Sequence, residues 1–316
     1  MTLLNLSTHP HFYLTDGGME TYLIFDEGID LPEFSSFTLL KSKAGVTALS
    51  EYYLRYMKIA AGHGMGFLFE TPTWRANTDW GARLGLSLAE LEEANRSAVA
   101  LMIELKQEFG ATACPMLISG CVGPRGDGYQ ANTNMDAEEA EDYHLPQVRA
   151  LRQAGADLVS GVTMTNAPEA IGLVRAAQAV DSPGVVSVTV ETDGRLPSGQ
   201  SLNEAIAQVD AETRQGPEWF MINCAHPTHF RDRLDPDASW AQRIGGIRAN
   251  SSCKSHAELD EATELDRGDS KDLANRYAEL CGAFPNIRVV GGCCGTDHSH
   301  IEDIAASVSA LLVDAT

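Results

Sequence analysis

Residues 287–297 read IRVVGGCCGTD, a β-branched apolar run that ends in glycines and two adjacent cysteines. Apolar runs of this kind recur along the 316 residues, and segments with helical spacing of apolar side chains separate them. There are eight runs, at Phe12–Leu14, Gly66–Glu70, Pro115–Ser119, Asp157–Gly161, Val185–Val190, Glu218–Asn223, Ile244–Ala249 and Ile287–Gly292. Strands that alternate with helices predict a parallel sheet, and eight such units predict an α/β protein with a (β/α)8 TIM barrel.

Several predicted helices carry recognisable end signals. The S-x-x-E patterns at 87–90 and 201–204 are capping boxes, and Asp136 is a predicted N-cap. The helix that follows Asp136 is expected to kink at Pro146, because proline lacks the amide hydrogen of the helical ladder. Residues 228–243, between the sixth and seventh runs, have the least clear helical pattern.

The alternative fold is an open, doubly wound sheet that binds a nucleotide. That fold requires a G-x-G-x-x-G turn after an early strand. Neither TDGGMET at 15–21 nor GPRGDG at 123–128 has this spacing followed by a helix. The barrel is therefore favoured, as a single domain over residues 1–316.

The composition excludes some classes of partner. Lys and Arg number 23 against 44 Asp and Glu, a formal charge of −21, which disfavours binding to nucleic acid or to anionic membranes. No apolar stretch approaches the roughly 20 residues of a membrane span, and residues 1–12 do not resemble a signal peptide. Seven cysteines in a long chain with a large core indicate reduced thiols in the cytoplasm. A homo-oligomer is left open.

Three cysteines follow predicted strands. Cys224 comes after the sixth run, and Cys293 and Cys294 come after the eighth. In a barrel these strand ends meet on the face that carries active sites, and three thiolates on Zn²⁺ leave the fourth position free for a substrate. Adjacent residues of a regular strand point to opposite sides, so we expect the glycines at 291–292 and 295 to bend the backbone and bring both sulfurs to one metal.

Two other readings of these cysteines stay open. A single cysteine is often a buried structural thiol, and a vicinal pair can be redox-active, although redox pairs usually read C-x-x-C. Of the remaining cysteines, Cys114 and Cys281 are expected to pack in the core. Cys121 and Cys253 follow strands and receive no role.

A zinc ion held by three thiolates is electron-rich and a poor Lewis acid. It suits a thiol substrate, because metal binding lowers the thiol pKa below its usual value of about 8.5 and yields a nucleophile. The reaction that this predicts is attack by a thiolate on an electrophilic carbon.

These segments resemble the homocysteine S-methyltransferase family. The resemblance rests on GGCCGTD at 291–297, on NC at 223–224 followed by Pro227, on TDGGMET at 15–21, and on SVTVETDGRLPSGQSLNEAI at 187–206. It implies a zinc-dependent (β/α)8 barrel that methylates homocysteine to methionine.

The resemblance also implies roles for individual residues. Cys224, Cys293 and Cys294 would be the zinc ligands, and Asp16 would bind the amino group of homocysteine. Backbone amides near the fourth strand and the loop after the sixth would hold its carboxylate. We place Thr163 beside the acceptor for this reason.

The chain departs from the family pattern at three strand ends. After the fourth strand the family has Glu-Thr, in which the Glu holds the ammonium, whereas this chain has Val162 before Thr163. Either Glu70 or Glu191 substitutes for that Glu, or the acceptor is a different thiol; Glu70 is our choice. The seventh strand ends in RANSS at 248–252 in place of the family's Y-P-N.

The third departure concerns the methyl donor. Arg75 stands where betaine-using members carry an aromatic residue. Trp74 and Trp80 have two readings, a cation–π face for the donor or hydrophobic packing under the loop, and packing is favoured. A self-contained barrel implies a small donor of the sulfonium or betaine type. The alternatives are the same chemistry on another thiol, a selenol or a methylated substrate, or a zinc-binding barrel without catalysis.

Overall fold

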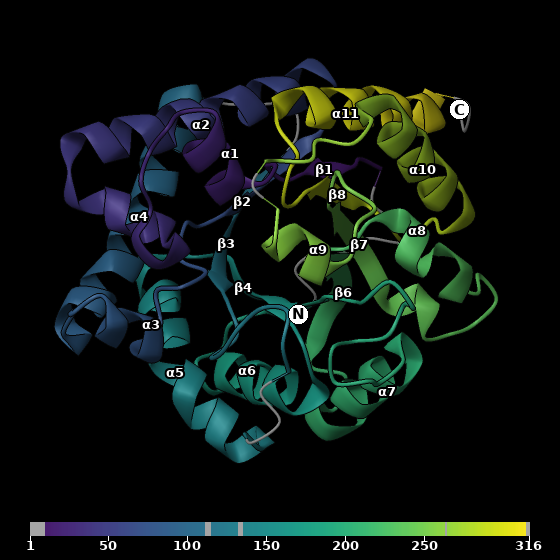
Figure 1. Ribbon diagram of the computed structural model, residues 1–316. Coiled ribbons are helices and arrows are strands. Elements are labelled where there is room, and N and C mark those ends of the chain that lie inside the picture. The colour runs from purple at the N-terminus through teal and green to yellow at the C-terminus, as the bar shows by residue number, and fades with distance from the viewer. Residues whose placement is uncertain (1–9, 111–114, 132–134, 263, 314–316) are drawn as a thin grey trace.

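The computed structural model describes residues 10–110, 115–131, 135–262 and 264–313. Its strands form one closed barrel in chain order, with every neighbouring pair parallel (Figure 1). The strands are β1 (Tyr13–Leu14), β2 (Gly66–Glu70), β3 (Met116–Val122), β4 (Leu158–Met164), β5 (Gly184–Val188), β6 (Pro217–Asn223), β7 (Ile244–Ala249) and β8 (Val289–Gly292). The predicted (β/α)8 barrel is confirmed.

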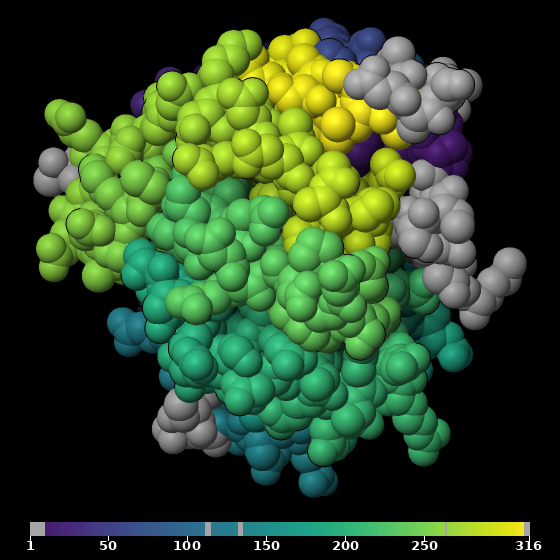
Figure 2. Space-filling view, turned by 90° about the vertical axis from the view of Figure 1, so that its right-hand side faces the viewer, coloured from purple at the N-terminus to yellow at the C-terminus, as the bar shows by residue number. Residues whose placement is uncertain are grey.

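Helices surround the barrel (Figure 1). They are α1 (Met19–Phe25), α2 (Lys43–Gly62), α3 (Thr78–Arg83), α4 (Leu88–Phe109), α5 (Ala137–Ala154), α6 (Ala167–Ala179), α7 (Leu202–Thr213), α8 (Pro227–Phe230), α9 (His256–Asp260), α10 (Ser270–Ala283) and α11 (His298–Val313). Short 3₁₀ turns lie at Pro32–Phe34, Ser36–Lys41, Arg231–Arg233 and Ala241–Arg243. The later helices, green to yellow, cover the side of the molecule that Figure 2 faces.

The predicted helix signals are found in the structure. Ser87 and Ser201 form capping boxes at the starts of α4 and α7. The Asp136 carboxylate accepts hydrogen bonds from two amides of the first turn of α5, at 2.9 and 3.0 Å. α5 continues through Pro146 to Ala154, so the proline does not end the helix. The unclear stretch at 228–243 contains only part of the four-residue α8 and two 3₁₀ turns.

Two apolar layers hold the barrel. The interior of the barrel is filled by a small cluster that includes Tyr13, Leu68, Trp219 and Met221. A much larger cluster packs between the strands and the surrounding helices. Because the interior below the strand ends is filled, open space is found at their C-terminal ends.

The remaining sequence predictions concern two packing cysteines and the absence of a membrane-spanning helix. Cys114 and residues 1–9 lie outside the described residues. Cys281 is buried in α10, as expected of a packing cysteine. Within the described ranges, no helix combines the length and apolar character needed to cross a bilayer.

Candidate metal centre and acceptor pocket

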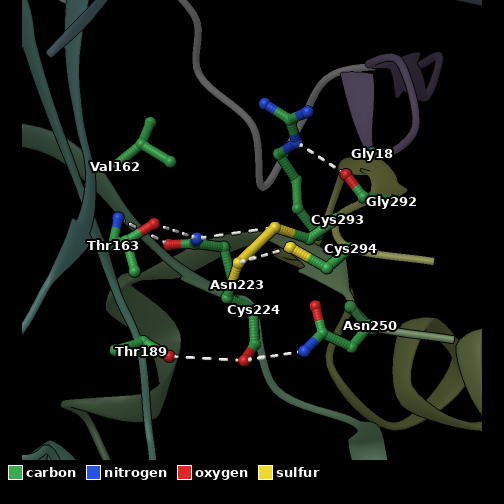
Figure 3. Close-up of a disulfide and its surroundings, with 12 residues drawn as sticks. Gly18, Val162, Thr163, Thr189, Asn223, Cys224, Asn250, Gly292, Cys293 and Cys294 are labelled. Carbon is green, nitrogen blue, oxygen red and sulfur yellow. Dashed lines mark hydrogen bonds between the residues drawn. A yellow bond between two sulfur atoms is a disulfide. The ribbon is translucent and has the colours of Figure 1, made fainter. Parts of the chain in front are cut away.

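The ends of β6 and β8 bring together the three predicted ligands. Cys224 follows β6, and Cys293 and Cys294 follow β8; one ligand sulfur of each lies within 4.8 Å of the other two. Cys224 and Cys293 are joined as a disulfide, and the Cys294 sulfur lies 3.9 Å from that of Cys224 (Figure 3). This is the one such cluster of Cys, His, Asp and Glu ligands among the described residues.

The backbone bends at two places to make this cluster. Cys224 has a φ of +52°, in the left-handed region that is unusual for a residue with a side chain, and Gly295 has a φ of +80°. Gly291 and Gly292 do not have positive φ, so the expectation that they form the bend is wrong. They are needed for close packing instead: a Cβ at either position would collide with the side chain of Thr15 or Thr296.

The cluster fits zinc once the disulfide is reduced. A tetrahedral zinc with bonds of about 2.3 Å holds its sulfur ligands about 3.8 Å apart, close to the 3.9 Å between Cys224 and Cys294. Burial raises the pKa of the Cys294 thiol, so a neighbouring cation is what would hold it as a thiolate at neutral pH. The role of the three cysteines as metal ligands stays a prediction.

Neighbouring polar groups hold the cysteines in place. The Asn223 side-chain amide donates to Thr163 Oγ1 at 2.8 Å and lies 4.0 Å from the Cys293 sulfur (Figure 3). The Cys224 carbonyl accepts from Asn250 Nδ2 at 3.1 Å and lies 2.6 Å from His256 Nε2. These contacts keep the ends of β4, β6 and β7 in register around the sulfurs.

A pocket of about 650 Å³, open mouth included, extends from this cluster. The predicted substrate residues Asp16, Thr163 and Glu70 all line it, together with Val162 and Arg248. The structure therefore brings every predicted site residue to one place, and their roles stay predictions.

Arg248, which the sequence reading did not select, neutralises Asp16. Its Nη2 lies 2.6 Å from Asp16 Oδ1, and both side chains are nearly inaccessible to solvent. Asp16 also accepts from the Tyr52 hydroxyl at 3.0 Å. The sequence feature that could have revealed this ion pair is an arginine inside the apolar run Ile244–Ala249, because a charged residue in a buried strand needs a buried partner.

Glu70 lies at the end of β2 with no such partner. It is 3% exposed, and neither of its carboxylate oxygens has a hydrogen bond within the described chain. Burial raises its pKa to about 7, partly offset by the charge of Arg248. The Ser119 and Ser160 hydroxyls lie near the carboxylate, but they bond to each other at 2.7 Å.

The amide and the hydroxyl of Thr163 are already hydrogen-bonded within the protein. Its φ is +65°, its amide donates to Asn223 Oδ1 at 2.9 Å, and its hydroxyl accepts from the same side chain. Val162 places an apolar side chain against the pocket beside it (Figure 3). Thr163 therefore shapes this wall mainly through Asn223.

Glu191, the other candidate substitute for the missing carboxylate, lies elsewhere. Its side chain is 36% exposed, pairs with His256 Nδ1 at 3.1 Å, and does not line the pocket. His256 also stacks on Tyr129, whose hydroxyl lies 3.5 Å from the Cys294 sulfur. Of the two glutamates, only Glu70 lines the pocket.

A second hollow adjoins the first and shares Trp74, Tyr129 and Cys294 with it. Arg75 lines this hollow, with its guanidinium carbon 3.8 Å from the ring centre of Trp80. Trp80 lines neither hollow, is buried and stacks with the protein's own arginines, in keeping with the favoured packing reading. Trp74 lines both hollows, and its indole N–H donates to the Val162 carbonyl at 3.0 Å.

A sequence profile of the family described as homocysteine S-methyltransferase matches residues 13–308. The chain belongs to the homocysteine S-methyltransferase family. The predicted family and the predicted methyltransferase class are thereby confirmed.

The relatives of this family member are distant but similar in length. Homocysteine S-methyltransferase 1 of Arabidopsis thaliana is 23% identical, over 92% of each chain. Homocysteine S-methyltransferase YbgG of Bacillus subtilis is 24% identical, over 76% of this chain and 79% of its own. The oxidised crystal form of the homocysteine methyltransferase MmuM from Escherichia coli has the same fold, with a TM-score of 0.74 at 22% identity, covering 96% of this chain and 97% of MmuM.

Proposed function

We propose that this protein is a zinc-dependent S-methyltransferase that transfers a methyl group from a small sulfonium or betaine-type donor to homocysteine, giving methionine. The observation that carries the proposal is the cluster of Cys224, Cys293 and Cys294 at one wall of a pocket, in a member of this family. A metallated crystal form of MmuM, with a TM-score of 0.73, is consistent with a metal in this fold.

Bound zinc would lower the pKa of the acceptor thiol, so that it reacts as a thiolate. The chain's own residues would bind the acceptor and exclude water. Asp16, Glu70 and Thr163 lie where the amino-acid part of the acceptor would be held, and the apolar wall at Val162 would exclude water. Alignment of a desolvated thiolate with an already activated methyl group is sufficient for transfer.

The lining of the second hollow is suited to a cationic methyl donor. Its lining includes Asp127, Asp260 and Glu264, with Phe34 and Trp74 as aromatic neighbours and Arg75 as an opposing charge. A sulfonium or methylated ammonium would be attracted to the carboxylates and to the aromatic faces. Free thiols at the metal site require a reducing compartment, and we infer the cytoplasm.

Metal analysis and product formation test the proposal together. Purified, reduced protein should hold close to one zinc per chain and form methionine from homocysteine with a panel of sulfonium and betaine donors. Cys293→Ser should lose the zinc and the activity. Cys253→Ser is the matched control, because Cys253 is exposed and lies outside the cluster. Full methyl transfer by zinc-free protein would refute the metal's role.

The second candidate is the same transfer to another thiol or a selenol. Val162 favours it, since an apolar side chain there cannot hold an ammonium. Replacing homocysteine by selenocysteine and by simple thiols in the same assay would reveal the preferred acceptor.

A further inference from the structure

Cys294 differs from the other two predicted zinc ligands in its position between the hollows. Cys224 and Cys293 line only the acceptor pocket, whereas Cys294 lines both that pocket and the second hollow. Under the proposed function, the second hollow holds the methyl donor. Because the thiolate form of cysteine is both the metal ligand and the nucleophile, the donor would meet the Cys294 sulfur as well as the acceptor thiolate.

The hydroxyl of Tyr129 lies against the Cys294 sulfur. The distance between the two atoms is 3.5 Å, and Tyr129 also lines both hollows. A sulfur that binds zinc as a thiolate carries no proton, so in that state the hydroxyl donates this hydrogen bond. A hydrogen bond to a thiolate withdraws electron density from it and lowers its reactivity toward carbon.

We propose that Cys294 is a site of self-methylation and that the Tyr129 hydroxyl protects it, so that the methyl group of the donor goes to the acceptor. This inference rests on the proposed function, which supplies the donor. In self-methylation the lone pair of the Cys294 thiolate forms the new sulfur–carbon bond. The bond between the methyl carbon and the donor's sulfonium sulfur or ammonium nitrogen breaks, and its electron pair leaves with the neutral sulfide or amine. The thioether that results is no longer a thiolate ligand, so the methylated protein should lose its zinc.

The ring of Tyr129 is held in place by a chain of contacts. It stacks on the His256 ring, with the ring centres 4.2 Å apart and the planes inclined by 20°. His256 is itself fixed, because Nδ1 lies 3.1 Å from the Glu191 carboxylate and Nε2 lies 2.6 Å from the Cys224 carbonyl. The hydroxyl is therefore positioned by the same segments that carry the sulfurs.

The other two ligand sulfurs are placed differently. The Cys293 sulfur lies 4.0 Å from Asn223 Nδ2, on the side of the acceptor pocket (Figure 3). Cys224 is only 5% exposed and does not line the second hollow. Of the three predicted ligands, Cys294 is therefore the one that a donor in the second hollow would contact.

The test incubates zinc-loaded protein, freed of reductant, with the donor and without an acceptor. Tyr129→Phe keeps the ring that stacks on His256 and removes only the hydroxyl. It should gain the mass of one methylene group on Cys294 at least about tenfold faster than the wild type, and lose its zinc at the same rate. Tyr143→Phe is the matched control and should react like the wild type, because the Tyr143 hydroxyl bonds to Asn77 and Tyr143 lines neither hollow.

Fragment ions that separate Cys293 from Cys294 locate the added methyl group. Equal rates in the wild type and Tyr129→Phe, or a methyl group on Cys224 or Cys293, would overturn the inference. Equal zinc content before the donor is added shows that Tyr129→Phe is folded. If it is not, the wild type decides, because excess methyl iodide should then methylate Cys294 before the other two ligands, and the reverse order would contradict the proposal. If no donor methylates homocysteine, the proposed function fails, and methyl iodide still compares Cys294 in the two proteins.

Discussion

Replacing Glu70 by glutamine should stabilise the metal-free, reduced protein, and the gain should depend on pH. Glu70 has a pKa of about 7 in the fold, raised by burial from 4.5. A raised carboxyl pKa means that the folded state holds the proton more tightly than the unfolded state does. The contribution of Glu70 to stability is therefore complete below about pH 4.5 and is lost as the pH rises through about 7.

The size of the effect follows from the two pKa values. A carboxyl pKa of about 7 in the fold against 4.5 in the unfolded chain corresponds to roughly 3 to 3.5 kcal/mol, at about 1.4 kcal/mol for each tenfold change in proton affinity. Glutamine keeps the shape of the protonated acid and does not ionise. The free energy of unfolding of Glu70→Gln should thus exceed that of the wild type by about 3 kcal/mol at pH 8 and by little at pH 5.

Urea denaturation of both proteins at several pH values measures this difference, with a chelator and a reductant present. Glu104→Gln serves as the control, because Glu104 is exposed on α4 and should give a difference near zero at every pH. A difference between Glu70→Gln and wild type that stays constant between pH 5 and pH 8 would refute the raised pKa. In a parallel series with zinc in place of the chelator, homocysteine should reduce the advantage of the variant, because a ligand stabilises most the protein that binds it most tightly.

Three further predictions concern other parts of the protein. Arg248→Met should lower the free energy of unfolding by about 3–5 kcal/mol, because it leaves the buried Asp16 charge unpaired; adding Asp16→Asn should recover much of that loss in the same denaturation assay. Zinc uptake should need reduction of the Cys224–Cys293 disulfide, so metal analysis should find zinc after dithiothreitol treatment and very little without it. Asp136→Ala should lower stability by about 1 kcal/mol by removing the cap of α5, without changing zinc content.

The barrel could be predicted from local patterns along the chain. Each strand is an apolar run that is largely buried, as in Gly66–Glu70 and Ile244–Ala249, and α4, α5 and α7 begin at the caps that the sequence predicts. The short helices α1, α3 and α9 were not predicted. Helices of five to seven residues are too short to be stable by themselves, so contacts with the rest of the fold decide them.

The three cysteines could be located from sequence because the closed barrel brings the strand ends to one face. Residues far apart along the chain then become neighbours, as Cys224 and Cys293 are, with Cα atoms 5.4 Å apart. The position of Glu70 at the end of an apolar run was visible in the same way, whereas the missing acid at Val162 follows only from the resemblance to the family.

The sequence alone thus predicted the eight-stranded barrel and placed the three cysteines, Asp16 and Glu70 at strand ends, because strand periodicity and strand-end positions are local properties. The family was suggested by the resemblance of its motifs. Only the tertiary structure decided which carboxylate is free. Asp16 and Arg248 are remote in sequence, and their pairing depends on the segment after β1 and on β7 bringing both side chains into one buried space. Whether a buried charge has a partner is a question of distance in three dimensions, and that distance distinguishes Glu70 from Asp16.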